Sequence, residues 1–164
     1  MGKYTSTDFK VYEVFFPIKT LVEKIKLGHI VPTMKRNIPE VLWNDIECSH
    51  YLESILIDFP LYPFSFCCEK NDTWEIYDGY QRIRAMRRFF CPVDSKEQLN
   101  LIGLEFLDEI EGYIYDRLST SYKKRLLNKY IRFYMVERNT KEEIKHLLLN
   151  RLNKNSRIYS TAAD

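Results

Sequence analysis

The segment Asp78-Gly79-Tyr80-Gln81-Arg82 holds the residue types of this chain that are best suited to chemistry. It stands between a predicted strand and a predicted helix, and its glycine permits a sharp turn. Free backbone N–H groups and the positive end of the helix dipole point out of such a junction, which suits it to hold phosphate oxygens. Arg82 would add paired hydrogen bonds to the same anion. Asp78 would orient that arginine or bind a Mg²⁺ ion that bridges two phosphates.

The same segment has a plainer interpretation, which the sequence leaves open. Asp-Gly is also a common turn, and Asp78 would then serve as the N-cap of the following helix. In this interpretation the arginines form a solvated face of the helix instead of an anion site; they are Arg82, Arg84, Arg87 and Arg88.

Strands and helices alternate in the first half of the chain and must position this segment. Runs rich in β-branched and aromatic residues predict strands, and apolar residues at helical spacing predict helices. Gly28 closes the first helix, and Cys91-Pro92 ends the last. The predicted strands cover residues 10–16, 29–31, 61–68 and 73–77, and the predicted helices cover 18–27, 42–59 and 80–90. The last two strands form a hairpin.

The sequence of the second half predicts a mostly helical portion with one added strand, and residues 99–106 are a further strand candidate. We expect a strand over 99–106, a short basic helix over 121–128 and a strand over 130–136 with one buried face. Thr140 and Glu143 form a capping box that opens the last helix. A soft boundary falls near 92–97. The prediction is an α+β protein with a core over 1–92 and a mostly helical extension over 93–164, as two packed parts or as one domain.

Length and composition fit an ordinary globular protein. The chain has 164 residues, of which 45% are apolar and 29% charged, and this excludes a disordered or collagenous protein. The net charge is only +2, but 17 of the 25 Lys and Arg residues stand in 81–164, so this half is expected to face anions.

Targeting and metal-binding signals are weak. Four cysteines and three histidines lack metal-ligand spacing, so we expect no zinc site. No apolar run approaches about 18 residues, and residues 1–10 contain no apolar run of the kind that a signal peptide has. We therefore expect a cytoplasmic protein with no membrane partner.

Several short motifs gain meaning from their order along the chain. Asp-Gly-x-Gln-Arg at 78–82 is preceded by Val31-Pro32, Arg36, Trp43, Glu53-Ser54-Ile55-Leu56 and Pro60, and it is followed by Arg151-Leu152-Asn153 and Tyr159-Ser160-Thr161. In this order the motifs resemble the prokaryotic domain family that opens the GmrSD-type, modification-dependent restriction enzymes. The resemblance spans about residues 14–163. The fold of that family resembles ParB and sulfiredoxin, and Gly79-x-x-Arg82-x-Arg84-Ala85 also matches the phosphate-binding box of ParB.

The resemblance implies a fold, an activity and a set of site residues. It implies a ParB/sulfiredoxin-like mixed-sheet core that binds and hydrolyses a nucleoside triphosphate with Mg²⁺, in a prokaryotic or phage DNA-defence system. It implies catalytic roles for Asp78, Gln81 and Arg82, with Asp78 as metal ligand. The nucleotide-binding residues that it implies are Arg36, Gly79, Tyr80, Arg84, Arg151 and Asn153.

The chain also departs from the family pattern. Lys35 stands where the family has Gln before Arg36, and Tyr80 replaces the first Gln of Asp-Gly-Gln-Gln-Arg. Family members often continue into a His-containing nuclease domain, whereas this chain ends at Asp164. We therefore expect a nuclease domain or subunit as a partner, and no DNA nicking by this chain alone.

A second hypothesis from another class is a non-enzymatic DNA-binding or protein-interaction module. Aromatic residues stand beside basic ones at 122–125, 129–130 and 132–134. Such rings stack on bases while the cations meet phosphates. Strand alternation instead buries half of the rings, which favours a core position for Phe133 and leaves Tyr134 open. For Arg151 the alternative is interaction with the carbonyls at the end of its helix.

Overall fold

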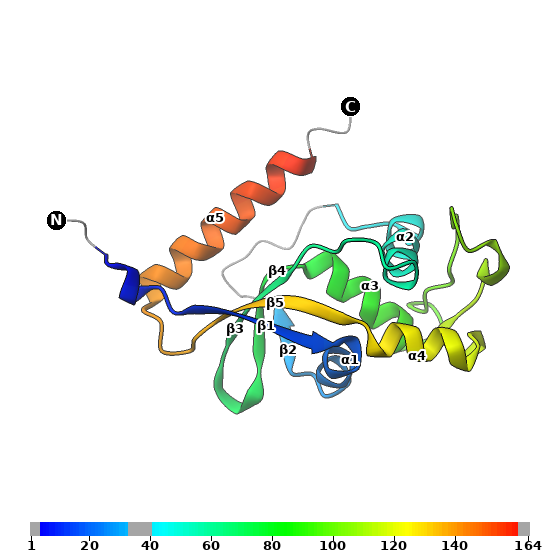
Figure 1. The fold of residues 1–164 in the computed structure, drawn as a ribbon, viewed down its shortest axis with the longest axis horizontal. Helices are drawn as coiled ribbons and strands as arrows, with labels where there is room; N and C mark the ends of the chain where they lie inside the picture. The colour runs from blue at the N-terminus through cyan, green and yellow to red at the C-terminus, as the bar shows by residue number, and fades with distance from the viewer. Residues whose placement is uncertain (1–3, 33–40, 161–164) are drawn as a thin grey trace.

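The computed structural model describes residues 4–32 and 41–160, with side chains up to residue 152. In this part of the chain five strands and five α-helices form an α+β protein, as predicted (Figure 1). The strands are β1 (Val11–Pro17), β2 (Ile30–Pro32), β3 (Phe64–Cys68), β4 (Trp74–Asp78) and β5 (Tyr130–Val136). The helices are α1 (Ile18–Lys26), α2 (Asp45–Leu56), α3 (Tyr80–Phe90), α4 (Thr120–Asn128) and α5 (Glu142–Ser160). Short 3-10 turns cover Ser6–Asp8, Lys70–Asp72, Asp108–Ile110 and Tyr115–Arg117.

The strands build one mixed sheet in the order β1-β5-β3-β4-β2. β1 with β5 and β3 with β4 are antiparallel, while β5 with β3 and β4 with β2 are parallel. The predicted hairpin of β3 and β4 is confirmed. β5 has its predicted bounds and lies between β1 and β3, so the second half of the chain supplies a central strand to the sheet that the first half begins.

Local signals explain where the first two helices begin and end. α1 ends before Gly28, whose φ of +70° is a backbone conformation that glycine adopts without strain. α2 is shorter than predicted, because Asn44 caps it. The Asn44 side chain accepts a hydrogen bond from the Glu47 backbone N–H at 2.9 Å, and the Glu47 carboxylate accepts one from the Asn44 N–H at 2.7 Å. The left-handed Asp58, with φ of 60°, follows the end of the helix.

Helices cover both faces of the sheet. Because successive side chains of a strand point to opposite faces, Phe66 joins the main hydrophobic core with α1, α2 and α3, while its neighbour Cys67 packs on the other face against Leu149 of α5. On β4, Ile76 likewise packs in the main hydrophobic core, and its neighbour Tyr77 packs on the opposite face with Cys67 and Leu149. In Figure 1, α5 lies apart from the other four helices.

The predicted strand over 99–106 is wrong. Leu99 and Leu101 are buried as an apolar strand would be, but the backbone there forms a loop. The Ile102 N–H donates to the Ser49 hydroxyl at 3.0 Å, and the Gly103 N–H donates to the Glu111 carboxylate at 2.9 Å. Side chains therefore accept hydrogen bonds from these two N–H groups, while the Leu99 and Leu101 N–H groups donate to the backbone carbonyls of Arg88 and Tyr113.

The predicted cap of the last helix is also wrong. α5 begins at Glu142, and the backbone N–H groups of Ile144 and Lys145 both donate to the Lys141 carbonyl. The Thr140 hydroxyl is buried and makes no hydrogen bond with the described residues. The helix thus begins too late for Thr140 to reach its first turn.

The division of the chain near 92–97 stays a prediction. Residues from both sides of this segment, such as Phe89 and Leu99, belong to the same hydrophobic core. Among the described helices, none combines the length and the apolar character that crossing a membrane requires.

Candidate functional site

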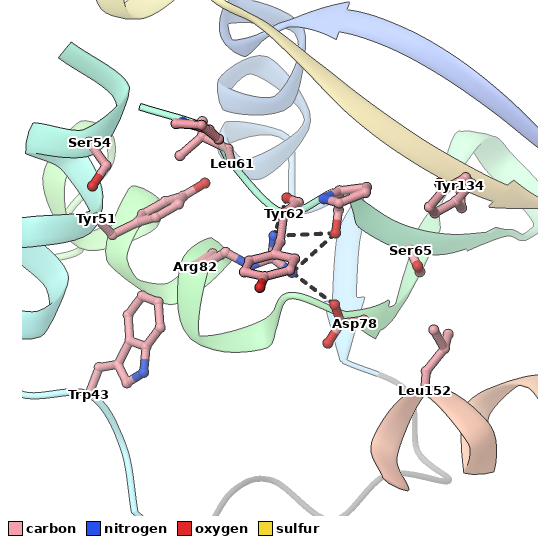
Figure 2. A pocket seen from close by; sticks show the side chains of 12 residues that line it. Trp43, Tyr51, Ser54, Leu61, Tyr62, Ser65, Asp78, Arg82, Tyr134 and Leu152 are labelled. Carbon is pink, nitrogen blue, oxygen red and sulfur yellow. Dashed lines mark hydrogen bonds and ion pairs between the residues drawn. The ribbon is translucent and has the colours of Figure 1, made fainter. Parts of the chain in front are cut away.

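A pocket of about 550 Å³ opens where β3 begins and β4 ends (Figure 2). Helix α2 forms one side, the segment before β3 forms another, and α5 reaches the far side with Leu152. The lining residues are Trp43, Tyr51, Ser54, Pro60, Leu61, Tyr62, Pro63, Ser65, Asp78, Arg82, Tyr134 and Leu152. The strand-to-helix junction that the sequence singled out therefore contributes Asp78 and Arg82 to this wall.

Arg82 is held by protein acceptors on both terminal nitrogens. Its Nη1 donates to the Tyr62 and Pro63 carbonyls, and its Nη2 donates to the Pro63 carbonyl at 3.2 Å and to Asp78 Oδ2 at 2.9 Å (Figure 2). The guanidinium also lies over the Phe64 ring, 4.5 Å from its centre. Only 12% of the side chain is exposed. Arg82 thus ties the start of β3 to the end of β4, which lie next to each other in the sheet.

Gly79 allows this close packing between α3 and β3. Its φ of +105° is unfavourable for other residues, and a Cβ atom added there would lie 2.4 Å from Cδ1 of Phe64. Gly79 itself is the N-cap residue of α3, with no side-chain cap. The turn interpretation is therefore wrong in placing Asp78 at the cap, and both the backbone conformation and the packing favour a glycine at position 79.

Gln81 and Arg84 hold a second segment beside the pocket. The Gln81 amide donates to the Val41 carbonyl at 2.9 Å and accepts from the Trp43 N–H at 3.2 Å. Arg84 Nη1 donates to the Trp43 carbonyl at 3.0 Å. These bonds fix the backbone that carries the Trp43 ring. Tyr80, by contrast, packs half-buried against the main hydrophobic core.

The expected solvated arginine face of α3 is wrong, because none of its four arginines is exposed. Arg88 is buried; it donates from Nη1 to Asp45 Oδ1 at 2.7 Å and from Nε to the Glu97 carbonyl at 3.0 Å. Arg87 is half-exposed and pairs with the Glu97 carboxylate at 2.8 Å. The arginines of this helix therefore bind three different loop segments.

The aromatic side of the pocket was not predicted from the sequence. Trp43 and Tyr51 lie with ring centres 5.9 Å apart and planes tilted by 54°. Tyr51 is buried, and burial raises the pKa of its hydroxyl to about 12, although the charge of Arg82 acts in the opposite direction. That hydroxyl makes no hydrogen bond with the described part of the protein. The available signal was the pair of hydroxyls at 51 and 54, one helical turn apart on α2.

The remaining predicted residues are not brought into this wall by the described structure. Arg36 lies outside the described residues, as does the side chain of Asn153. Arg151 is exposed on α5, and of the described residues of α5 only Leu152 lines the pocket.

The comparisons with known proteins name no relative from which a role could be transferred. Searches of protein-family models, curated proteins and solved structures each found no match to this chain.

Proposed function

We propose that this chain binds a nucleoside triphosphate in the pocket and hydrolyses it, within a prokaryotic or phage DNA-defence system. The observation that carries the proposal is a pocket that joins an aromatic wall to an ionic pair. Trp43, Tyr51 and Tyr62 contribute rings, and Asp78 and Arg82 stand at the turn into α3. Bases stack on aromatic rings, and phosphates favour the N-terminal end of a helix. A volume of about 550 Å³ lies in the usual range for small-molecule sites.

The proposal assigns positioning roles to several motif residues. Gln81 and Arg84 hold the backbone of Trp43, so they would shape the aromatic wall instead of contacting the phosphates. Arg82 would fix Asp78 and the Tyr62–Pro63 backbone, and its charge would face a phosphate bound in the pocket. A fold relationship to ParB and sulfiredoxin belongs to the same proposal. The mixed sheet and the glycine turn from β4 into α3 support it.

Mg²⁺ fits this site only as an ion that the nucleotide brings with it. Asp78 uses Oδ2 for Arg82, which leaves Oδ1 for a cation. The described residues contain no cluster of three His, Cys, Asp or Glu side chains that would hold a metal by themselves. Mg²⁺ commonly binds through one or two carboxylates together with substrate phosphates. When bound, it would neutralise charge on the phosphates, and Asp78 is the residue that would hold it.

The test is nucleotide binding and phosphate release by the purified chain. Calorimetry with each of the four triphosphates in Mg²⁺ should show binding, and phosphate release should require Mg²⁺. Asp78→Asn keeps the shape of the side chain and removes its charge, so it should abolish release. Asp116→Asn is the matched control, because Asp116 is exposed and lies outside the pocket. Absence of binding by the unaltered chain, or release that is unchanged in Asp78→Asn, would show the proposal to be wrong.

A second candidate function, single-stranded DNA binding without turnover, is favoured by one surface. Phe15, Tyr130 and Tyr134 are exposed on the same face of β1 and β5. The Arg132 guanidinium lies 5.6 Å from the centre of the Phe15 ring on that face. Rings beside a cation suit base stacking and phosphate contact.

Fluorescence anisotropy with a labelled single-stranded oligonucleotide separates the two functions. DNA binding should weaken steeply as salt rises, and Tyr130→Ala should weaken it further, while exposed Phe106, which lies outside the sheet, provides the control Phe106→Ala. Equal binding by both variants would exclude this face as the DNA site.

A further inference from the structure

The buried hydroxyl of Tyr51 has no hydrogen-bond partner in the described part of the chain. Tyr51 exposes 9% of its surface, lines the pocket, and makes no hydrogen bond with the described residues through Oη. Figure 2 shows its ring extending from α2 towards Leu61, with the hydroxyl at the tip. A buried hydroxyl without a partner costs free energy, and proteins satisfy most such groups. A pocket ligand is the natural source of the missing partner.

The protonation state of the Tyr51 hydroxyl determines which hydrogen bonds it can make with a ligand. Because burial raises the pKa of Tyr51 to about 12, the hydroxyl keeps its proton at neutral pH and is able to donate a hydrogen bond. The apolar surroundings thus favour an uncharged ligand group next to it over a phosphate.

Ser54 complements Tyr51 on the same side of the pocket. It lies one helical turn further along α2 and also lines the cavity. Its hydroxyl donates to the His50 carbonyl at 2.7 Å, so its proton is already used and only its lone pairs remain. The α2 side therefore offers one donor and one acceptor, and the Trp43 ring lies next to Tyr51. A donor and an acceptor together are the pattern that the polar edge of a planar base requires.

The ionic side of the pocket lies next to the α2 side, where the charge of Arg82 acts on Tyr51. Asp78 and Arg82 stand at the turn into α3, and Figure 2 shows them between the α2 side and Leu152 of α5. The pocket is thus divided into an uncharged aromatic side and an ionic side. A molecule with a planar polar part and an anionic part matches both.

We propose that Tyr51 is the specificity-determining residue of this pocket: its hydroxyl donates a hydrogen bond to the nucleobase, and Ser54 Oγ accepts one from the same base. The inference rests on the proposed nucleotide-binding function, and it assigns the base to the α2 side. It makes affinity depend on the base as well as on the phosphates.

The experiment compares nucleotides with inorganic tripolyphosphate, which has the phosphates and no base. Calorimetry on the full chain with Mg²⁺ uses ATP, GTP, CTP, UTP and tripolyphosphate as probes. The unaltered chain should prefer one nucleotide over the others and over tripolyphosphate. Tyr51→Phe should weaken binding of that nucleotide by about tenfold, which corresponds to 1.4 kcal/mol, and should leave tripolyphosphate binding unchanged. Tyr12→Phe removes the hydroxyl of an exposed ring that lies outside this pocket and should change neither.

The outcomes distinguish this inference from the function on which it rests. Equal binding of nucleotides by Tyr51→Phe and the unaltered chain overturns the role of Tyr51 and leaves nucleotide binding in place. Weaker binding of tripolyphosphate by Tyr51→Phe also overturns it, because the effect would then be structural. Failure of the unaltered chain to bind any of the five probes overturns the proposed function itself, and this inference with it. Loss of an unpaired hydroxyl should not destabilise the fold, so Tyr51→Phe should unfold at the same or a higher urea concentration.

Discussion

The carboxylate of Glu53 lies 2.9 Å from the backbone nitrogen of Leu107 and accepts its hydrogen bond. The same carboxylate accepts hydrogen bonds from the N–H groups of Glu105 and Phe106, at 3.1 and 2.8 Å. Glu53 is 3% exposed, so a charged group is buried on α2 to satisfy three successive backbone donors of one loop. These donors lie at the end of the segment that was predicted as a strand, and the carboxylate stands in for the acceptors of a neighbouring strand there.

Glu53→Gln should destabilise the fold by about 2 kcal/mol, because an amide nitrogen would face a backbone donor and leave it unpaired. Urea unfolding followed by circular dichroism measures the loss. Glu105→Gln is the matched control, since Glu105 is exposed and only its backbone takes part in this contact. A difference of less than about 0.5 kcal/mol between the two variants, which is the usual range for surface substitutions, would contradict a structural role for the Glu53 carboxylate.

Gly79→Ala should be more damaging than the same change at another glycine with positive φ. Both Gly79 and Gly112 adopt φ values, +105° and +75°, that disfavour alanine. At Gly112 nothing lies within 4 Å of the added Cβ, whereas at Gly79 the ring of Phe64 lies 2.4 Å away. We expect a loss of about 1–2 kcal/mol in the Gly112 variant from the backbone alone, and about 1–3 kcal/mol more in the Gly79 variant from overpacking.

Thermal unfolding of the two glycine variants provides the comparison. Combining Gly79→Ala with Phe64→Leu should recover part of the loss, because the smaller side chain removes the clash and leaves the backbone strain. Equal losses at Gly79 and Gly112 would mean that the close approach of Phe64 does not determine the residue at position 79.

The sequence predicted the positions of helices and strands better than it predicted which groups their side chains bind. β5 and α3 were placed at the correct residues, because strand alternation and an amphipathic stripe are local patterns. The junction at Asp78 and Gly79 was also placed correctly at the end of β4. The pairing of Asp78 with Arg82 was predicted and is present. The other acceptors of Arg82 and the acceptor of Gln81 were not predictable, since they are backbone carbonyls of segments about 20 and 40 residues away in the sequence. Backbone carbonyls carry no sequence signature.

The hydrogen bonds of Glu53 were not predicted for a similar reason. The role of Glu53 depends on a loop about 50 residues later in the chain, and nothing in the local pattern of α2 marks it. The strand over 99–106 was predicted from apolar residues that are indeed buried, but burial does not specify which groups satisfy the backbone. The proposed function and the preferred base also remain predictions, because both depend on how side chains from α2, β4 and α3 are arranged around the pocket.

Arg82→Lys should destabilise the fold although it keeps the charge. The guanidinium reaches the Tyr62 and Pro63 carbonyls and Asp78 at once and lies on the Phe64 ring, and an ammonium group has neither the fork nor the flat face. We expect a loss of about 1–3 kcal/mol in urea unfolding, the cost of leaving buried acceptors unpaired.

Arg87→Lys is the control for this substitution. Arg87 lies on the same helix and pairs with Glu97 in a half-exposed position, so its replacement should cost less than about 1 kcal/mol. If the two lysine variants were equally stable, the hydrogen bonds from Arg82 to the start of β3 would not contribute to the stability of the fold. The role of Arg82 would then be limited to binding a ligand.

The Asp8 carboxylate should titrate far below its ordinary range in the folded protein. Lys141 donates to its Oδ1 at 2.7 Å, and this hydrogen bond, followed by those of the Thr5 backbone and side chain, lowers the pKa of Asp8 to about 2. The folded pKa is depressed, so the stabilisation is complete above the unfolded value of about 3.9 and is lost as the pH falls through about 2.

Carbon-detected NMR of the Asp8 carboxyl group measures the midpoint of this titration. Lys141→Met should move it upward but not to 3.9, because the Thr5 bonds remain. An unchanged midpoint in that variant would show that the hydrogen bond from Lys141 to Asp8 does not form in solution.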